Sequence, residues 1–161
     1  MRMAILAASA AAAAGCGSAT IDADKRANEI KQELYEQTGL EIDSVTCPGD
    51  VPCEKGTRFK CTAAAEGGEV VVAVNQPTDK CEIRWTIERG TVSSAKLEDQ
   101  IEQAFRDQTT SDAFVDCGRR YRVAITGREF NCEIENRKGE IETIVARMED
   151  DLGNVYWELD R

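Results

Sequence analysis

The chain lacks histidine altogether and has no Cys-x-x-Cys sequence. Without an imidazole base, Ser-His hydrolytic chemistry is excluded within this chain. A zinc site is not expected either, because zinc sites usually show closely spaced cysteine pairs and often histidine. Thioredoxin-like disulfide exchange usually needs the Cys-x-x-Cys pair that is missing. These absences predict a protein without a bound metal, without a cofactor and without enzymatic activity.

Basic residues are outnumbered: 20 Lys and Arg stand against 30 Asp and Glu, which gives a formal net charge of -10. An acidic surface repels nucleic-acid phosphates and anionic lipid headgroups, so we expect neither as a direct ligand. The one dense basic run is Arg119, Arg120, Tyr121 and Arg122. This run could contact an acidic partner protein, although a solvated loop is the commoner explanation of such a run.

Long hydrophobic runs are also missing. The longest, Met3–Ala14, is too short to span a bilayer as a helix. It is rich in alanine, stands at the start of the chain and follows Arg2, which is the pattern of a secretory signal peptide. The chain is therefore predicted to be exported rather than inserted as a membrane-spanning helix.

The apolar run ends in Ala13-Ala14-Gly15-Cys16, which resembles the bacterial lipobox that lipoprotein signal peptidase cuts before the cysteine. In lipoproteins that cysteine carries diacylglycerol and an acylated N-terminus, and more than one acyl chain gives stable anchoring. We expect residues 1–15 to be the signal peptide and residues 16–23 to be a lipidated N-terminus with a short flexible tether. The expected address is a bacterial membrane, contacted through lipid on Cys16. In a Gram-negative cell this would be the outer membrane, facing the periplasm or the surface.

An internal repeat is visible at an offset near 71 residues. The matching positions are Ile30, Leu34, Gln37 and Thr38 with Ile101, Phe105, Gln108 and Thr109, and Gly56, Phe59 and Cys61 with Gly127, Phe130 and Cys132. A helix face, a glycine, an aromatic residue and a cysteine in one register indicate a duplication. We place the two units at residues 24–90 and 94–161.

Each unit begins with an amphipathic helix and continues in strands. Apolar residues recur at helical spacing in residues 27–34 and again in residues 97–105. Strands are expected at 42–47, 58–64, 69–75 and 81–88, and at 114–117, 129–136, 140–148 and 155–159, with 121–126 as a further candidate. The predicted fold class is α+β, in which each unit packs one N-terminal helix on a small antiparallel sheet of three to four strands.

Seven cysteines leave six once Cys16 is taken for lipid, and an even number in an exported chain indicates disulfides. The repeat selects among the alternative pairings, because equivalent cysteines should form equivalent bridges. The predicted disulfides are Cys47 with Cys61, Cys117 with Cys132, and Cys53 with Cys81. A closed loop of about 15 residues should contribute about 3 kcal/mol of stability in the chain-entropy model.

The segments Val45-Thr46-Cys47-Pro48 and Gly56-Thr57-Arg58-Phe59-Lys60-Cys61, together with a helix ending in Leu34–Gly39, resemble the family called domain of unknown function 4333. The resemblance covers about residues 22–88. The second unit departs from it, because Gly118 stands where Pro48 would and the loop between cysteine and glycine is longer. The family is common in exported lipoproteins and has no assigned activity, so the resemblance implies fold and location only.

Taken together, these patterns predict an exported, lipid-anchored envelope lipoprotein that acts as a non-catalytic binding or structural module, with an envelope protein as a candidate partner. One alternative is a periplasmic protein inhibitor, which rests on fold analogy alone. A less favoured alternative is a hydrolase that uses carboxylates such as those of the run Glu149-Asp150-Asp151. Trp85 and Trp157 could be ligand platforms, but their matching positions on final strands favour core packing.

Overall fold

The computed structural model of the protein describes residues 19–160, so the predicted signal peptide and Cys16 lie outside the described residues. The elements, in chain order, are α1 (Ala23–Thr38), β1 (Ile42–Thr46), β2 (Arg58–Ala65), β3 (Gly68–Asn75), β4 (Arg84–Arg89), β5 (Thr91–Ser93), α2 (Ser94–Thr109), β6 (Ala113–Asp116), β7 (Tyr121–Val123), β8 (Glu129–Asn136), β9 (Ile141–Met148) and β10 (Val155–Leu159). All paired strands are antiparallel, and the fold is α+β as predicted.

The first half, residues 19–90, contains a four-stranded sheet in the order β1-β2-β3-β4 with α1 against one face. Ile30 and Leu34 lie one helical turn apart, which puts both on the same side of α1, and both are fully buried. Alternate residues of β2 and β3, such as Ala63 and Val72, complete this core. The helix begins at Asp22, whose carboxylate accepts a hydrogen bond from the backbone N–H of Lys25 at 3.0 Å.

The second half, residues 91–160, contains a four-stranded sheet in the order β10-β9-β8-β6 with α2 against one face. Leu97 and Ile101 project from α2 onto a core that includes Ile134 of β8 and Ile144 of β9. The last turn of α2 ends at Thr110, which adopts the left-handed conformation that usually belongs to glycine. Each half therefore has one helix covering one face of one sheet.

All three predicted disulfides are confirmed: Cys47–Cys61, Cys53–Cys81 and Cys117–Cys132. The first and third each link the residue after an edge strand to the neighbouring strand of its sheet. The second links the β1–β2 loop to the β3–β4 loop. Disulfides persist in oxidising compartments, which fits a location outside the cytoplasm.

Among residues 19–160, no helix has the length and apolar character needed to cross a membrane.

Residues 19–22 differ from the expectation of a flexible tether. Thr20 forms a bridge with Pro52, and the N–H of Ile21 donates to the carbonyl of Val51 at 2.8 Å. The Ile21 side chain is only 5% exposed and packs with Val51 and Cys53. The Cys53–Cys81 disulfide fixes the loop against which Ile21 packs. Ile21, which we expected in the flexible tether, is therefore bound to the first half before α1 begins.

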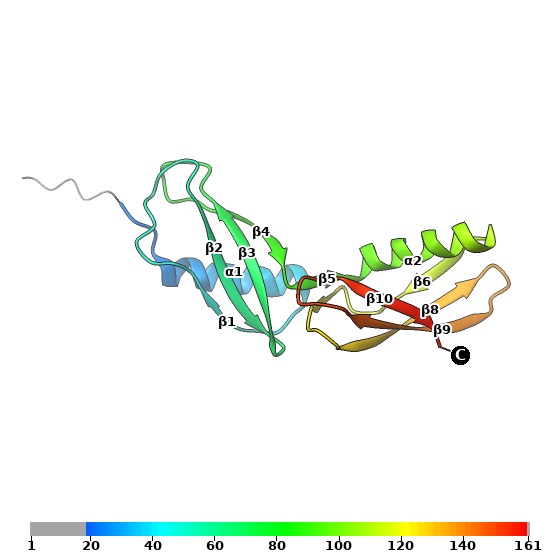
Figure 1. The fold of residues 1–161 in the computed structure, drawn as a ribbon. Coiled ribbons are helices and arrows are strands. Elements are labelled where there is room, and N and C mark those ends of the chain that lie inside the picture. Colours follow the sequence, from blue (N-terminus) through cyan, green and yellow to red (C-terminus); the bar gives the residue numbers. More distant parts are fainter. Residues whose placement is uncertain (1–18, 161) are drawn as a thin grey trace, which may run out of the picture.

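The two halves pack together through the segment between β6 and β8, residues 117–128, which we call the docking loop. Its strand β7 pairs with β5 in a separate two-stranded sheet. Val123 of β7 is fully buried in the core of the first half, and Tyr121 and Ile125 pack against the same core. Figure 1 shows the result: the halves lie end to end in an elongated molecule, and the described chain starts at the outer end of the first half.

Two glycines permit this arrangement. A Cβ atom on Gly90, between β4 and β5, would lie 2.1 Å from the carbonyl oxygen of Glu69, and its φ of +91° favours glycine. A Cβ atom on Gly68, at the start of β3, would lie 2.6 Å from Cγ1 of Val123 and 2.8 Å from Cγ1 of Ile125. Gly68 therefore leaves the space that the docking loop fills.

Replacing Gly68 by Ala should destabilise the protein by about 1–3 kcal/mol, because the added methyl group overpacks the contact with Val123 and Ile125. The free energy of unfolding in urea measures the effect. Gly49→Ala is the matched control, since nothing lies within 4 Å of its added Cβ and its φ is not in the left-handed region. Equal stability of the two variants would contradict the close packing of the docking loop.

Candidate binding site

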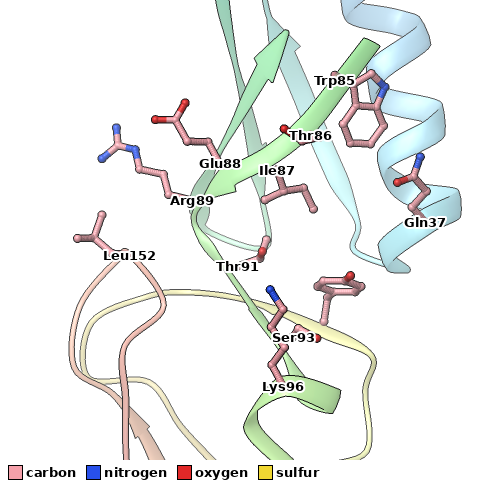
Figure 2. Close-up of a pocket in the computed structure, with 11 residues that line it drawn as sticks. Gln37, Trp85, Thr86, Ile87, Glu88, Arg89, Thr91, Ser93, Lys96 and Leu152 are labelled. Atoms are coloured by element: carbon pink, nitrogen blue, oxygen red, sulfur yellow. The ribbon is translucent and has the colours of Figure 1, made fainter.

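A groove of about 390 Å³ lies where the two halves meet, within the size range of small-molecule sites. We call it the junction groove. It is bordered by β4, the end of α1, the start of α2, the docking loop and the β9–β10 turn, and Figure 2 shows its side chains. Its apolar lining comes from Trp85, Ile87, Tyr121 and Leu152. Most of its lining comes from residues 85–96, to which the docking loop adds Tyr121 and the β9–β10 turn adds Leu152.

The indole of Trp85 is held in place on the groove wall. Trp85 and Ile87 lie opposite Val74 and Val72 of β3, so both side chains point to the side of the sheet that α1 covers. The indole N–H of Trp85 donates to a carboxylate oxygen of Glu33 on α1 at 2.6 Å. Trp85 thus packs against the first core, as the sequence favoured, and also lines the groove. Trp157 packs against the core of the second half.

Two cations line the groove, Arg89 at the end of β4 and Lys96 in the first turn of α2. Neither forms an ion pair with another residue of the part of the chain that the structure describes. The acid beside Arg89 is Glu88, and it forms an ion pair with Lys60 at 2.6 Å. Glu88 also lines the groove, but Lys60 engages its carboxylate, so the two cations leave the lining with a net positive charge in a chain whose formal net charge is -10.

The start of α2 differs from the start of α1 in a way that adds to this positive charge. The first helix is capped by the Asp22 carboxylate and has Asp24 in its first turn. The second begins after Ser93, whose side chain makes no capping bond, and its first turn contains Lys96 and no acidic residue. Acidic groups normally offset the partial positive charge of a helix start. At α2 that charge is left without an acidic group, beside the groove.

The basic run Arg119–Arg122, predicted as a partner contact, makes contacts within the chain. Arg119 forms an ion pair with Glu66 in the β2–β3 turn at 2.5 Å, and Arg120 donates to the carbonyl of Gln37 at 3.3 Å. Tyr121 lines the groove. Contact of these residues with another protein stays a prediction. No pattern in the sequence relates them to Glu66 or Gln37, which lie more than 50 residues away in the chain.

Arg122 organises the docking loop from inside. It donates to the hydroxyl of Ser94 at 2.8 Å and to the carbonyl of Cys117, and its guanidinium lies 4.2 Å from the centre of the Phe130 ring. Burial lowers the pKa of Arg122, and the charge of Arg119 lowers it further. The Ser94 hydroxyl also donates to the carbonyl of Arg119, so the first residue of α2 is bonded to the loop that docks the halves.

The acidic run Glu149-Asp150-Asp151 lies in the β9–β10 turn. The Asp150 carboxylate accepts bonds from the side-chain amide of Asn154 and from backbone N–H groups of residues 152–154, which lower its pKa. Backbone and side-chain bonds from Thr126 lower the pKa of Asp151. Both shifts favour the ionised carboxylate, whereas a general acid needs a raised pKa.

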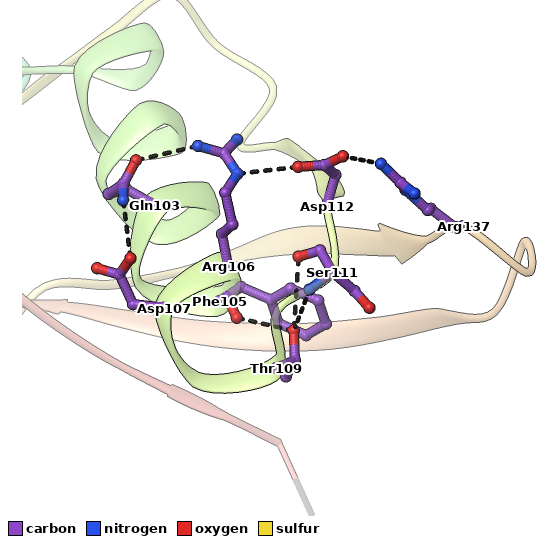
Figure 3. Close-up of polar contacts among 8 residues, drawn as sticks. All are labelled: Gln103, Phe105, Arg106, Asp107, Thr109, Ser111, Asp112 and Arg137. Atoms are coloured by element: carbon purple, nitrogen blue, oxygen red, sulfur yellow. Dashed lines mark hydrogen bonds and ion pairs between the residues drawn. The ribbon is translucent and has the colours of Figure 1, made fainter.

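A third carboxylate with a lowered pKa stands at the far end of α2. Figure 3 shows Asp112 between Arg106 and Arg137, with hydrogen bonds from both guanidinium groups. These hydrogen bonds, from Arg137 first and Arg106 second, lower its pKa. They link the end of α2 to the β8–β9 turn and have a structural role. Within residues 19–160 no group of three or more Cys, Asp or Glu side chains is placed to hold a metal ion.

Comparison with known families gives one match. Residues 4–80 match the model of the family described as domain of unknown function, DUF4333, which supports assigning this part of the chain to that domain family. The matched range contains α1 and β1 to β3, in agreement with the resemblance of the first unit. Searches of curated proteins and of solved structures found no match.

The turn at Asp150 should make stability depend on pH. Because its pKa in the folded protein is lowered from 3.8, its contribution is complete above that value and is lost as the pH falls through the lower folded value. Asp150→Asn should therefore unfold at lower urea concentration than the wild type at neutral pH, and the gap should close on acidification. Glu149→Gln is the control, since no hydrogen bond to its carboxylate is found within residues 19–160. A gap that stays constant with pH would contradict the assignment.

Proposed function

We propose that the protein is an exported, lipid-anchored envelope lipoprotein built from two copies of one helix-and-sheet unit, and that it acts as a non-catalytic binding module. The binding site in this proposal is the junction groove. The observation that carries it is the groove itself, a depression of about 390 Å³ in which aromatic and aliphatic side chains stand beside polar and cationic ones. Concave sites that combine an apolar wall with polar groups that fix a ligand's orientation are typical of small-molecule recognition.

Two observations support export and anchoring. Three disulfides are typical of proteins outside the cytoplasm. The family match starts at residue 4 and so includes the Ala13-Ala14-Gly15-Cys16 segment that resembles a lipobox. Because Ala19 and Ile21 are bonded to the Val51–Cys53 loop, an anchor at Cys16 would sit near the outer end of the first half. The junction groove, at the other end of that half, would then lie farther from the membrane by about the length of the half.

The likeness of the two halves supports the duplication. In both, one edge strand follows the helix, and the next two strands and the last strand follow it in order across the sheet. In both, a disulfide links the end of that edge strand to the strand beside it. The second copy would then have lengthened one loop, and that loop would have become the docking loop.

The chemistry of the groove supports a binding role more than a catalytic one. Ser93 and Lys96 both line it, but within the described residues no hydrogen bond joins their side chains, as a Ser-Lys nucleophile would require. The three carboxylates whose pKa is shifted are all favoured in the ionised form and serve turns and helix ends. The inhibitor alternative has no comparable observation in its favour.

Anchoring is tested by metabolic labelling with a palmitate analogue. The wild-type chain should be labelled and Cys16→Ser should not, because the proposed acceptor thiol is gone. Ser18→Ala keeps the cysteine and should be labelled like the wild type. Undiminished labelling of Cys16→Ser would reject the anchor.

Groove binding is tested by NMR on the full chain carrying Cys16→Ser, so that no lipid competes. Naphthalene-2-sulfonate, or its neutral analogue naphthalene-2-sulfonamide, should shift the indole N–H signal of Trp85 and leave that of Trp157 in place as an internal control. Leu152→Ala should weaken binding about fivefold or more through lost apolar contact, whereas Ile141→Ala, an equally exposed position outside the groove, should not. Binding that leaves the Trp85 signal unmoved would reject the site.

A further inference from the structure

The net charge of the junction groove depends on whether the carboxylates near it already have partners within the chain. The Glu33 carboxylate accepts the indole N–H of Trp85, and Glu88 forms an ion pair with Lys60. Lys96 extends from the start of α2 toward Thr91 and so lies within the groove, as Figure 2 shows. Within residues 19–160 no carboxylate forms an ion pair with Lys96. The groove thus presents an ammonium group to whatever enters it.

Arg89 adds a second cation at the rim. It follows Glu88 at the end of β4, and Figure 2 shows both side chains extending toward the side on which Leu152 of the β9–β10 turn lies, away from Trp85. The Arg89 side chain is long and exposed, so it can turn toward a group bound between the halves. Lys96 and Arg89 therefore stand on different elements, one on each half, and both line the same depression.

The apolar part of the lining lies on the wall formed by β4 and the docking loop. Trp85, Ile87 and Tyr121 are each partly buried and pack against the first core, so their exposed faces form a firm apolar wall. Leu152 adds a side chain that is 55% exposed at the rim. Aromatic faces next to cations without an ion-pair partner suit a ligand that has one anionic end and one apolar end. The anionic end can bind a cation while the apolar end packs on the aromatic faces.

We propose that the junction groove binds a small anion joined to a compact apolar group, a carboxylate, sulfonate or phosphate on an aromatic or short aliphatic body. This inference rests on the proposed function of the groove and names its ligand class. Lys96 holds the anionic group, Arg89 closes over it from the other half, and the indole of Trp85 contacts the apolar body. Nucleic acids and membrane headgroups stay disfavoured, because the chain as a whole has a formal net charge of -10.

The test compares the two naphthalene probes, which have nearly the same shape and differ in charge. Exposed ion pairs are each worth up to a fewfold in affinity, so two cations should give naphthalene-2-sulfonate about a tenfold preference over naphthalene-2-sulfonamide. The preference should fall to about threefold or less in the Lys96→Gln/Arg89→Gln double variant. It should also shrink at high salt. Lys138→Gln, an exposed lysine of the β8–β9 turn, is the control and should leave the preference unchanged.

The outcomes separate the two proposals. If neither probe moves the Trp85 signal, the binding function of the groove is rejected, and the ligand class with it. If both probes bind with equal affinity, or if the preference survives in the double variant, the groove binds apolar ligands and the inference about the anion is wrong. Decanoate is the third probe: tighter binding of this long, flexible acid than of naphthalene-2-sulfonate would contradict the compact apolar body, and weaker binding supports it. Thermal unfolding of the double variant shows that the loss of preference is not a loss of fold.

Discussion

Val123 is fully buried in the core of the first half, although it belongs by sequence to the second. The burial of Val123 fixes the position of the docking loop, and the contacts of that loop then position the segments around it. The β5–β7 pairing places the start of α2, the Arg119–Glu66 ion pair holds the β2–β3 turn, and Arg122 and Ser94 connect the loop to the helix. Without this contact the halves would be two small units on a linker, and the groove between them would have no defined shape.

The need for such a contact follows from size. A unit of about 70 residues buries too little apolar surface to be comfortably stable, so small domains usually rely on cross-links or on docking. This chain uses both. The Cys47–Cys61 and Cys117–Cys132 disulfides each fasten an edge strand to its sheet, and the docking loop makes one half a part of the core of the other. The junction groove lies beside the contact that holds the halves together, since Tyr121 of the docking loop both packs against the first core and lines the groove.

The features that local pattern controls could be predicted from the sequence. Helical spacing of Ile30 and Leu34 identified α1, and the register between Cys61 and Cys132 led to the correct disulfides. The docking of the halves could not be predicted, because it depends on contacts between distant residues such as Gly68 and Val123. The one visible sign was the longer loop of the second unit, and length alone does not say where a loop packs.

The same limit applies to the site. The sequence identifies Trp85 as an aromatic residue at the end of a unit. Trp85 lines a groove only because Lys96, Tyr121 and Leu152 lie near it in the fold. The basic run was noticed for its charge, and its ion pair with Glu66 became visible only in three dimensions. The position of Ile21 before the helix predicts a tether, but Ile21 packs against the loop that the Cys53–Cys81 disulfide holds. In each case the residue was identifiable and its partner was not.

The central claim, that the two halves form one cooperative body, is tested most directly by urea unfolding with one tryptophan in each half. In Trp157→Phe the fluorescence of Trp85 reports the first half, and in Trp85→Phe that of Trp157 reports the second. Far-UV circular dichroism of the same sample reports the whole chain, with disulfides kept oxidised. A single cooperative body requires the fluorescence and dichroism transitions to coincide in each variant. Separate transitions, with one half unfolding at a urea concentration at which the other stays folded, would contradict the account.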